Sequence, residues 1–213
     1  MKYDVIIVAS GKGSRANLGY NKVFYKLKDG RSVLDCSINL FDNDTDCQRI
    51  IVVTNHEYFH EVKGNKVIVV EGGKERRNSV YNGLKEVKSD YVLIHDGARP
   101  YLHINALESI KEKLETCDCV VLGKMATDTV KTVKDNKVIE TIDRNTIFLA
   151  ETPQGFKSSL IKDAYEKCDD INFTDDTSLV ESLGYEVNIV LDEYNNKKLT
   201  KEEDFKNLWL RNW

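Results

Sequence analysis

Residues 4–16 read Asp-Val-Ile-Ile-Val-Ala-Ser-Gly-Lys-Gly-Ser-Arg-Ala, a short apolar run that leads directly into a glycine-rich loop. A run of this length, rich in β-branched residues, is typical of a buried strand. Further Val- and Ile-rich runs alternate with longer segments of helical period along the chain, with no repeat or low-complexity tract. This alternation predicts an α/β fold on a mostly parallel sheet.

The expected elements follow from these two periods. Strands are predicted at Asp4 to Ala9, Arg49 to Thr54, Lys66 to Glu71, Asp90 to His95, Cys119 to Gly123 and Glu186 to Leu191. Helices are predicted at Ser32 to Phe41, Arg77 to Val87, Ile104 to Glu115, Lys157 to Lys167, Asp175 to Leu183 and Lys201 to Leu210, with residues 151–156 opening the fourth. The hydroxyls of Ser32, Thr174 and Thr200 suit N-caps, and Gly184 suits a helix terminator.

One stretch departs from the alternation. Residues 129–143 alternate loosely about Asp135-Asn136, a pair that suits the tight turn of a β-hairpin. Because polar side chains occur on both faces, neither face can bury much against the main sheet, and an isolated hairpin is marginal in water. We therefore expect the hairpin to meet a partner, the alternative being an edge hairpin that lies on its own domain.

Length and composition restrict the function classes. The 213 residues favour one domain, and 41% hydrophobic with 31% charged residues excludes disordered, collagen-like and membrane proteins. The 31 Lys and Arg against 35 Asp and Glu give a net charge of −4, so a nucleic-acid-binding surface is not expected. Any phosphate binding must come from a few basic residues gathered at one place.

The cysteines and histidines indicate location and metal content. The five cysteines are odd in number and form no C-x-x-C pair, which favours reduced thiols in a cytoplasmic protein. The first apolar run is too short for a signal-peptide core or a membrane span. His56 and His60 are four residues apart, but no third ligand is evident near them, so a solvated helix face is expected and no protein-held metal site is predicted.

The first glycine-rich loop admits three chemistries. The spacing of a nucleotide-hydrolysing phosphate loop is absent. Gly11, Gly13 and Ala16 formally match a dinucleotide fingerprint, but the residues that follow make a poor first helix. The remaining interpretation is an irregular loop whose amides approach phosphates while Arg15 and Lys22 supply charge, with a plain glycine turn as the alternative.

Polar residues also follow the third and fourth predicted strands. Gly72-Gly73 with Ser79 suits the recognition of a flat polar group through hydrogen bonds, although an ordinary strand-to-helix turn is equally compatible. Asp96 can hold a ribose hydroxyl or a metal-bound water, and Arg99 an anion, the alternative being a surface pair. Taken singly, the segment Thr174-Asp175-Asp176 is a helix cap, and Lys198 is either a third cation or a solvated lysine.

Taken in order, these motifs resemble those of the cytidylyltransferases that activate sugar-alcohol phosphates, most closely the methylerythritol phosphate branch, over nearly the whole chain. The motifs are Gly11-Lys12-Gly13-Ser14-Arg15, Asn21-Lys22, Gly72-Gly73 with Arg76 and Asn78-Ser79-Val80, His95-Asp96-Gly97-Ala98-Arg99-Pro100, Asp128-Thr129, Asp143-Arg144-Asn145, Thr152-Pro153-Gln154, Thr174-Asp175-Asp176 and Asn196-Lys197-Lys198-Leu199-Thr200.

The resemblance implies a Rossmann-like three-layer nucleotidyltransferase sandwich. The implied reaction transfers CMP from CTP to 2-C-methyl-D-erythritol 4-phosphate, releases pyrophosphate, belongs to non-mevalonate isoprenoid synthesis, and uses Mg²⁺ on the nucleotide phosphates. It also implies a homodimer in which a protruding β-arm, residues 127–146 of the single domain 1–213, embraces the second subunit and delivers the equivalents of Arg144 and Thr129 to the neighbour's site.

The roles implied by the resemblance fall into two groups. Arg15 and Lys22 neutralise the nucleotide phosphates, while Lys198 and Arg144 hold the attacking phosphate. The residues implied in substrate binding are Ser10, Gly11, Gly13, Gly72, Gly73, Ser79, Asp96 and Gly97 for the nucleotide, and Arg99, Thr129 and Thr152 for the acceptor.

Three other functions remain open from the sequence. The first is a ribitol-5-phosphate cytidylyltransferase, which Tyr194-Asn195 slightly favours, whereas Asp143-Arg144-Asn145 favours methylerythritol phosphate. The second is a nucleotide-binding protein without catalysis. The third is a dinucleotide-dependent oxidoreductase, which would need an acid at the tip of the second strand, where Thr54-Asn55-His56 has none.

Overall fold

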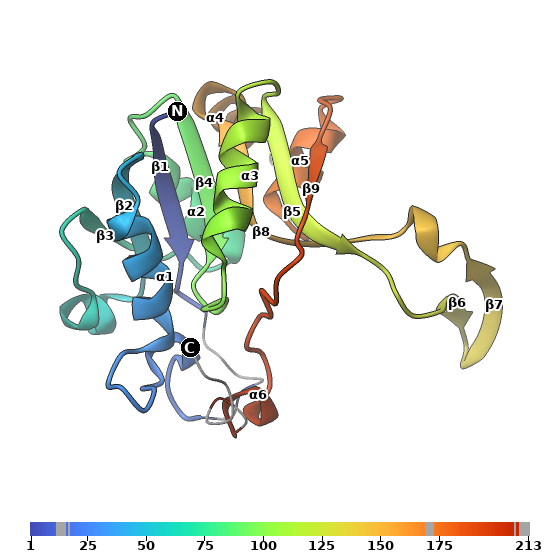
Figure 1. Ribbon diagram of the computed structural model, residues 1–213, viewed down its shortest axis with the longest axis horizontal. Helices are drawn as coiled ribbons and strands as arrows, with labels where there is room; N and C mark the ends of the chain where they lie inside the picture. The colour runs from blue at the N-terminus through green and yellow to red at the C-terminus, as the bar shows by residue number, and fades with distance from the viewer. Residues whose placement is uncertain (12–15, 17, 169–172, 207, 209–213) are drawn as a thin grey trace.

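The computed structural model describes residues 1–11, 16, 18–168, 173–206 and 208 (Figure 1). In this part of the chain the main sheet has the strand order β3-β2-β1-β4-β8-β5-β9. The strands are β1 (Tyr3–Val8), β2 (Cys47–Thr54), β3 (Val67–Glu71), β4 (Tyr91–Asp96), β5 (Cys119–Met125), β8 (Phe148–Lys157) and β9 (Asn188–Leu191). Neighbouring strands are parallel except β8, which is antiparallel to both β4 and β5. The predicted mostly parallel sheet is confirmed.

Helices cover both faces of the sheet. The main helices are α1 (Val33–Asn43) and α3 (Ile104–Leu114) on one face and α2 (Arg76–Leu84), α4 (Ser158–Lys167) and α5 (Asp176–Ser182) on the other (Figure 1). The alternation of side chains along β1 explains the two layers, because Val5 and Ile7 pack in the cluster that contains Leu34 of α1, whereas Ile6 packs in the cluster that contains Val80 of α2. Strands buried on both faces need the continuous apolar run that the sequence shows.

The N-cap predictions have mixed outcomes. Ser32 caps α1 in a reciprocal box with Asp35, as predicted. For α5 the capping side chain is Asp175, one residue after the predicted Thr174, and Gly184 follows this helix with a φ of 82°. The last described helix, α6, spans Glu202–Lys206, and Thr200 donates its hydroxyl to the carbonyl of Lys198 instead of capping it.

The prediction that residues 151–156 open a helix is wrong, because they belong to β8. Their polar composition hides the strand, since Thr152 and Gln154 are buried and find hydrogen-bond partners inside the protein. Gly155 permits the close packing that a strand needs here. A Cβ at Gly155 would come within 2.7 Å of Leu114 and 3.0 Å of Val120.

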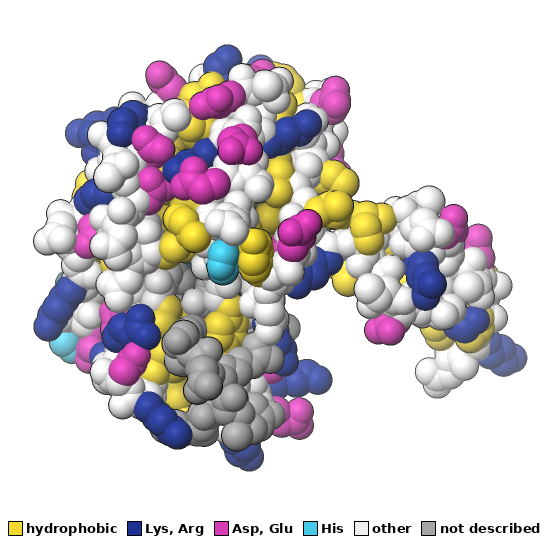
Figure 2. All heavy atoms as spheres, viewed as in Figure 1, with side chains coloured by type: hydrophobic (Ala, Val, Ile, Leu, Met, Phe, Trp, Pro, Cys, Tyr) yellow, Lys and Arg dark blue, Asp and Glu magenta, His cyan; other side chains and the backbone are white. Residues whose placement is uncertain are grey.

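The hairpin is formed by β6 (Val130–Lys134) and β7 (Lys137–Ile142). Asp135 and Asn136 have φ values of 50° and 60°, as the predicted tight turn requires. The hairpin makes its own two-stranded sheet and projects away from the main sheet (Figures 1 and 2). The alternative of an edge hairpin lying on its own domain is therefore wrong, and the predicted protruding arm is confirmed.

Three short 3₁₀ helices, η2 (Lys22–Phe24), η3 (His56–Glu61) and η4 (Arg144–Thr146), lie between these elements in the described part of the chain. None of the helices described is long and apolar enough to cross a membrane.

Candidate active site

A cleft of about 790 Å³ opens at the carboxyl ends of the parallel strands β1, β3 and β4. This edge of an open α/β sheet is where ligands bind. The predicted site residues that line the cleft are Ser10, Gly11, Lys22, Gly72, Gly73, Asp96 and Lys198. Sequence segments that are far apart thus meet at one place, whereas Gly13 and Arg15 lie outside the described residues.

The loop after β1 is anchored by Asn21. Its side-chain amide donates to the carbonyl of Ala9 at 2.5 Å, and its side-chain oxygen accepts from the backbone of Val23 at 3.3 Å. Asn21 is buried and precedes Lys22, the first residue of η2. The short helix therefore starts at a fixed point, which places Lys22 at the wall of the cleft.

The loop after β3 packs directly on the loop after β1. A Cβ at Gly72 would lie 2.4 Å from the Cβ of Ser10, so only glycine permits this approach. The buried hydroxyl of Ser79 bonds to the hydroxyl of Ser10 at 2.8 Å and accepts from the backbone of Gly73 at 3.0 Å. Ser79 thus ties the two loops together.

Asp96, the last residue of β4, is surrounded by cations. Lys198 Nζ lies 2.7 Å from its carboxylate, Arg76 Nε 3.6 Å and Arg99 Nε 3.8 Å. Burial alone raises the pKa of Asp96, but these positive charges outweigh it and hold the pKa well below its usual range. Asp96 is therefore ionised at neutral pH. The cleft is lined by more cations than carboxylates, namely Lys22, Lys74, Arg76 and Lys198 against Glu75 and Asp96, which suits an anionic ligand.

Arg76 belongs to this centre although it was not among the predicted site residues. Its guanidinium donates to Asp176 at 2.8 Å, and Asp176 also accepts from the hydroxyl of Tyr165 at 2.6 Å. Burial disfavours its charge, but Asp176 and Asp96 raise the pKa of Arg76 above its ordinary value. Asp176, expected to be part of a helix cap, is thus a buried counter-ion whose partner lies 100 residues away, and no local sequence pattern indicates such a pair.

The position of Asp96 is fixed by contacts of its neighbours Thr152, His95 and Gly97. The hydroxyl of Thr152 accepts from the backbone of Asp96 at 3.0 Å and lies 3.2 Å from His95 Nδ1. Burial lowers the pKa of His95 to about 4, so its imidazole is neutral at pH 7. The backbone of Gly97 donates to Val8 at 3.0 Å, and a Cβ there would meet that carbonyl at 3.2 Å.

Arg99 is half-buried beside these residues and donates to the carbonyl of Asn196 at 2.7 Å. The two predicted residues of the arm are not brought to the cleft within one chain. Arg144 begins η4 at the base of the arm and donates to the carbonyl of Thr127 at 2.7 Å, and Thr129 precedes β6. Both are exposed.

The donor set does not fit a metal held by the protein alone. In the part of the chain that the structure describes, no three His, Cys, Asp or Glu side chains gather as a metal site. Asp96 is already paired with cations.

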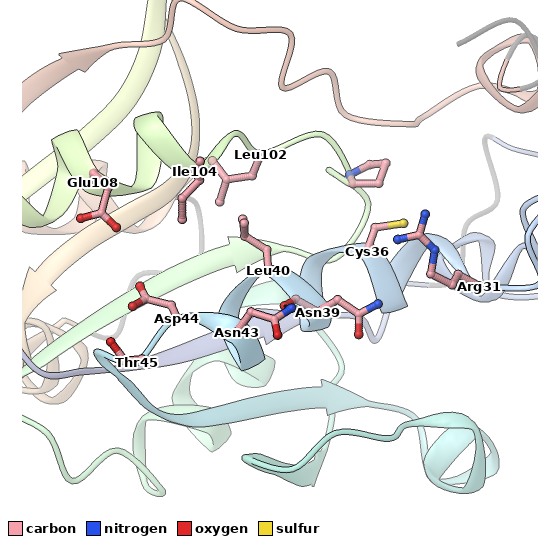
Figure 3. A pocket seen from close by; sticks show the side chains of 11 residues that line it. Arg31, Cys36, Asn39, Leu40, Asn43, Asp44, Thr45, Leu102, Ile104 and Glu108 are labelled. Atoms are coloured by element: carbon pink, nitrogen blue, oxygen red, sulfur yellow. The ribbon is translucent and has the colours of Figure 1, made fainter. Parts of the chain in front are cut away.

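A second cavity of about 550 Å³ lies between α1 and α3 (Figure 3). Leu40, Leu102 and Ile104 line its middle, with Arg31 toward one end and Glu108 toward the other. None of the predicted site residues that the structure describes lines it, so the cleft at the sheet edge is the candidate site.

Known proteins match this chain over nearly its whole length. The sequence model of the family described as 2-C-methyl-D-erythritol 4-phosphate cytidylyltransferase matches residues 3–208. Proteins of that name from Clostridioides difficile and Bacillus velezensis are 43% and 39% identical, over 95% and 96% of this chain and 90% and 93% of theirs. The crystal structure of the Francisella tularensis enzyme of that name has a TM-score of 0.83 at 30% identity and covers 99% of both chains.

These matches confirm the resemblance and the three-layer α/β fold, and they do not favour the ribitol phosphate enzymes. A dinucleotide-dependent oxidoreductase is excluded as well, since the relatives are transferases. The chain belongs to the 2-C-methyl-D-erythritol 4-phosphate cytidylyltransferase family.

Proposed function

We propose that this chain transfers the cytidylyl group of CTP to 2-C-methyl-D-erythritol 4-phosphate, a step of non-mevalonate isoprenoid synthesis, and releases pyrophosphate. Family membership over residues 3–208 carries this proposal. The chain is a CTP-dependent nucleotidyltransferase, and the cation-lined cleft supports this activity because both substrates and the leaving group are phosphate anions.

In the reaction, a phosphate oxygen of the acceptor attacks the α-phosphorus of CTP in line. A new P–O bond forms, and the bond from the α-phosphorus to the bridging oxygen of the β-phosphate breaks, so pyrophosphate leaves with that electron pair. The acceptor phosphate is already ionised at neutral pH, so no general base is needed. The protein's contribution is to align the two phosphates and stabilise the negative charge of the transition state.

We assign the nucleotide side to the two glycine loops and the end of β4. Arg15 and Lys22 neutralise the phosphates and stabilise the transition state. The backbone of Ser10, Gly11, Gly13, Gly72 and Gly73, with Ser79 holding the two loops together, forms the cradle for the nucleotide, while Asp96 and Gly97 face the ribose. Mg²⁺ enters on the CTP phosphates and, when bound, offsets their charge.

We assign the acceptor side to Lys198, Arg99 and Thr152 of the same chain, with Arg144 and Thr129 of a partner subunit. The separation of the arm from the cleft within one chain supports sharing between subunits (Figure 1). Val133, Val138 and Ile139 on the arm are 58–65% exposed, as expected for a surface that a second copy covers. We therefore propose a homodimer formed through residues 127–146, with residues 1–213 as one catalytic domain.

We also propose a cytoplasmic location. The five cysteines are all free thiols. Thiols of this kind persist in a reducing compartment.

The direct test is pyrophosphate release from CTP and Mg²⁺ with methylerythritol phosphate or ribitol 5-phosphate in parallel. Release with methylerythritol phosphate alone is the expected result. Release with ribitol 5-phosphate alone, or with neither acceptor despite CTP binding, would contradict the proposed acceptor.

A further inference from the structure

Buried polar atoms without a hydrogen-bond partner are concentrated beside Arg99. In the described part of the chain these atoms are Arg99 Nε, Glu151 Oε2, Asp192 Oδ2 and Asn196 Oδ1. Native proteins leave few such atoms, so a group of them in one network needs an explanation. The function assigned above uses neither Glu151 nor Asp192.

The contacts connect these residues into one network. Arg99 Nη1 donates to the carbonyl of Asn196 at 2.7 Å and lies 4.0 Å from Glu151 Oε1. Asp192 has one carboxylate oxygen bonded to the backbone of Tyr194 at 2.8 Å and the other 3.9 Å from Lys124 Nζ. The acidic side chains thus lie between two cations, one from the loop after β4 and one from β5.

Asp192 acts on the carboxyl group of Glu151 as a hydrogen-bonding neighbour and as a like charge, and both effects raise the pKa of Glu151. Two facing carboxylate oxygens cannot both accept without a donor, but one proton between them satisfies both unpaired atoms. Burial raises the pKa of Glu151 to about 6, with Arg99 and Lys124 opposing the shift and Asp192 adding to it. Glu151 therefore gains a proton as the pH falls through about 6.

We propose that Glu151 and Asp192 form a proton-sharing carboxyl pair that orients Arg99, which makes Glu151 a positioning residue of the acceptor site. The proposal rests on the proposed function, in which Arg99 lines the acceptor pocket. When Glu151 is ionised, it attracts the guanidinium and offsets part of its charge. When Glu151 shares the proton, Asp96 remains the ionised carboxylate beside Arg99, 3.8 Å from its Nε, and more of the guanidinium charge acts on the acceptor phosphate.

The kinetic test compares Glu151→Gln with the wild type. The glutamine amide can donate to Asp192 and its oxygen can accept from Arg99, so it reproduces the protonated pair at every pH. We expect the acceptor KM of this variant at pH 8 to be about three- to tenfold below the wild-type value, and the two values to converge near pH 5. The KM for CTP stays the same within about twofold.

Two features make the comparison specific. The acceptor phosphate itself titrates near pH 6, but this effect is common to both enzymes and cancels in the ratio of their KM values. Glu193→Gln alters an exposed glutamate next to Asp192 and serves as the matched control, with a wild-type profile expected. Parallel pH profiles for the wild type and Glu151→Gln would overturn the proposal.

The pair can also be tested without turnover. Carbon-13 NMR of the glutamate carboxyls is expected to show Glu151 titrating near pH 6 in the wild type and at lower pH in Asp192→Asn. A titration of Glu151 that is the same in the wild type and in Asp192→Asn would refute the shared proton. Because this measurement needs no substrate, it distinguishes a failure of the carboxyl pair from a failure of the proposed function.

Discussion

The ammonium nitrogen of Lys198 lies 2.7 Å from the carboxylate of Asp96, although 102 residues separate them in the chain. Arg76 stands by the same carboxylate and is itself held by Asp176. An arriving phosphate can therefore take Lys198 as its partner while Asp96 keeps a counter-ion. We infer that this exchange of partners accompanies acceptor binding, since an uncompensated buried carboxylate would be costly.

Replacing Lys198 by alanine tests this exchange. We expect kcat/KM for the acceptor to fall about 100- to 1000-fold, because the variant lacks the charge that we propose holds the attacking phosphate in place. CTP binding, measured by calorimetry, should weaken far less. Lys197→Ala is the matched control, since that neighbouring lysine is exposed and pairs with Asp204. Equal losses in the two variants would count against a specific role of Lys198.

Gly72 offers a steric test of the nucleotide side. A methyl group there would lie 2.4 Å from the Cβ of Ser10, so Gly72→Ala must push the two glycine loops apart. We expect CTP affinity to fall at least about tenfold, with a stability loss of about 1–3 kcal/mol. Gly83→Ala is the matched control. Its new Cβ would lie 2.9 Å from Ile6 in the core, so it introduces a similar steric clash at a position far from the two glycine loops. If Gly83→Ala weakens CTP binding equally, general destabilisation explains the effect.

Some elements of this fold are specified by their own residues, and others are specified by the elements packed against them. The parallel strands and most helices were predictable because each carries its own period and composition, as in β1, where every residue from Tyr3 to Ile7 is buried. Strand β8 was missed because a strand of Thr, Pro, Gln and Gly is specified by its neighbours β4 and β5, not by its own residues. Tertiary context overrides propensity in such a case.

In the candidate active site, likewise, some residues could be placed from the sequence and others could not. The glycine loops and Lys22 follow predicted elements at positions that the sheet topology brings to one edge, so their meeting could be expected. The pairing of Arg76 with Asp176, and of Glu151 with Asp192, depends on packing between distant elements. Thr152 was predicted to line the acceptor pocket, and its hydroxyl contacts the backbone of Asp96 and the imidazole of His95.

The buried imidazole of His95 makes the free energy of unfolding depend on pH. Its pKa is about 4 in the folded protein against 6.5 ordinarily, so between these values the unfolded chain binds a proton that the folded one does not. The stabilisation is complete above pH 6.5 and is lost as the pH falls toward 4, by at most about 3 kcal/mol. In His95→Gln this titration is absent, so the difference in unfolding free energy from the wild type should shrink on acidification. A difference that stays constant from pH 7 to 4.5 would contradict the neutral buried histidine.

The position of Arg144 at the base of the arm leads us to predict that each active site is shared between two subunits. Arg144 lies outside the cleft of its own chain, and Lys22 lies in it, so Arg144→Ala and Lys22→Ala should each abolish most activity as homodimers. A heterodimer of the two variants contains one site with both residues intact and one with neither. Mixing the inactive chains under conditions of subunit exchange should therefore restore activity, up to about a quarter of the wild-type value for random pairing of equal amounts with two sites per dimer.

The control for this experiment is a mixture of Arg144→Ala with a double variant that carries both substitutions. Every heterodimer in this mixture lacks Arg144 at both sites, so no recovery is expected, although exchange proceeds equally. Tagged chains and native mass spectrometry would report the fraction of heterodimer. If heterodimers form and activity stays at the level of this control, each chain completes its own site, and the arm has to be assigned a role other than delivering Arg144.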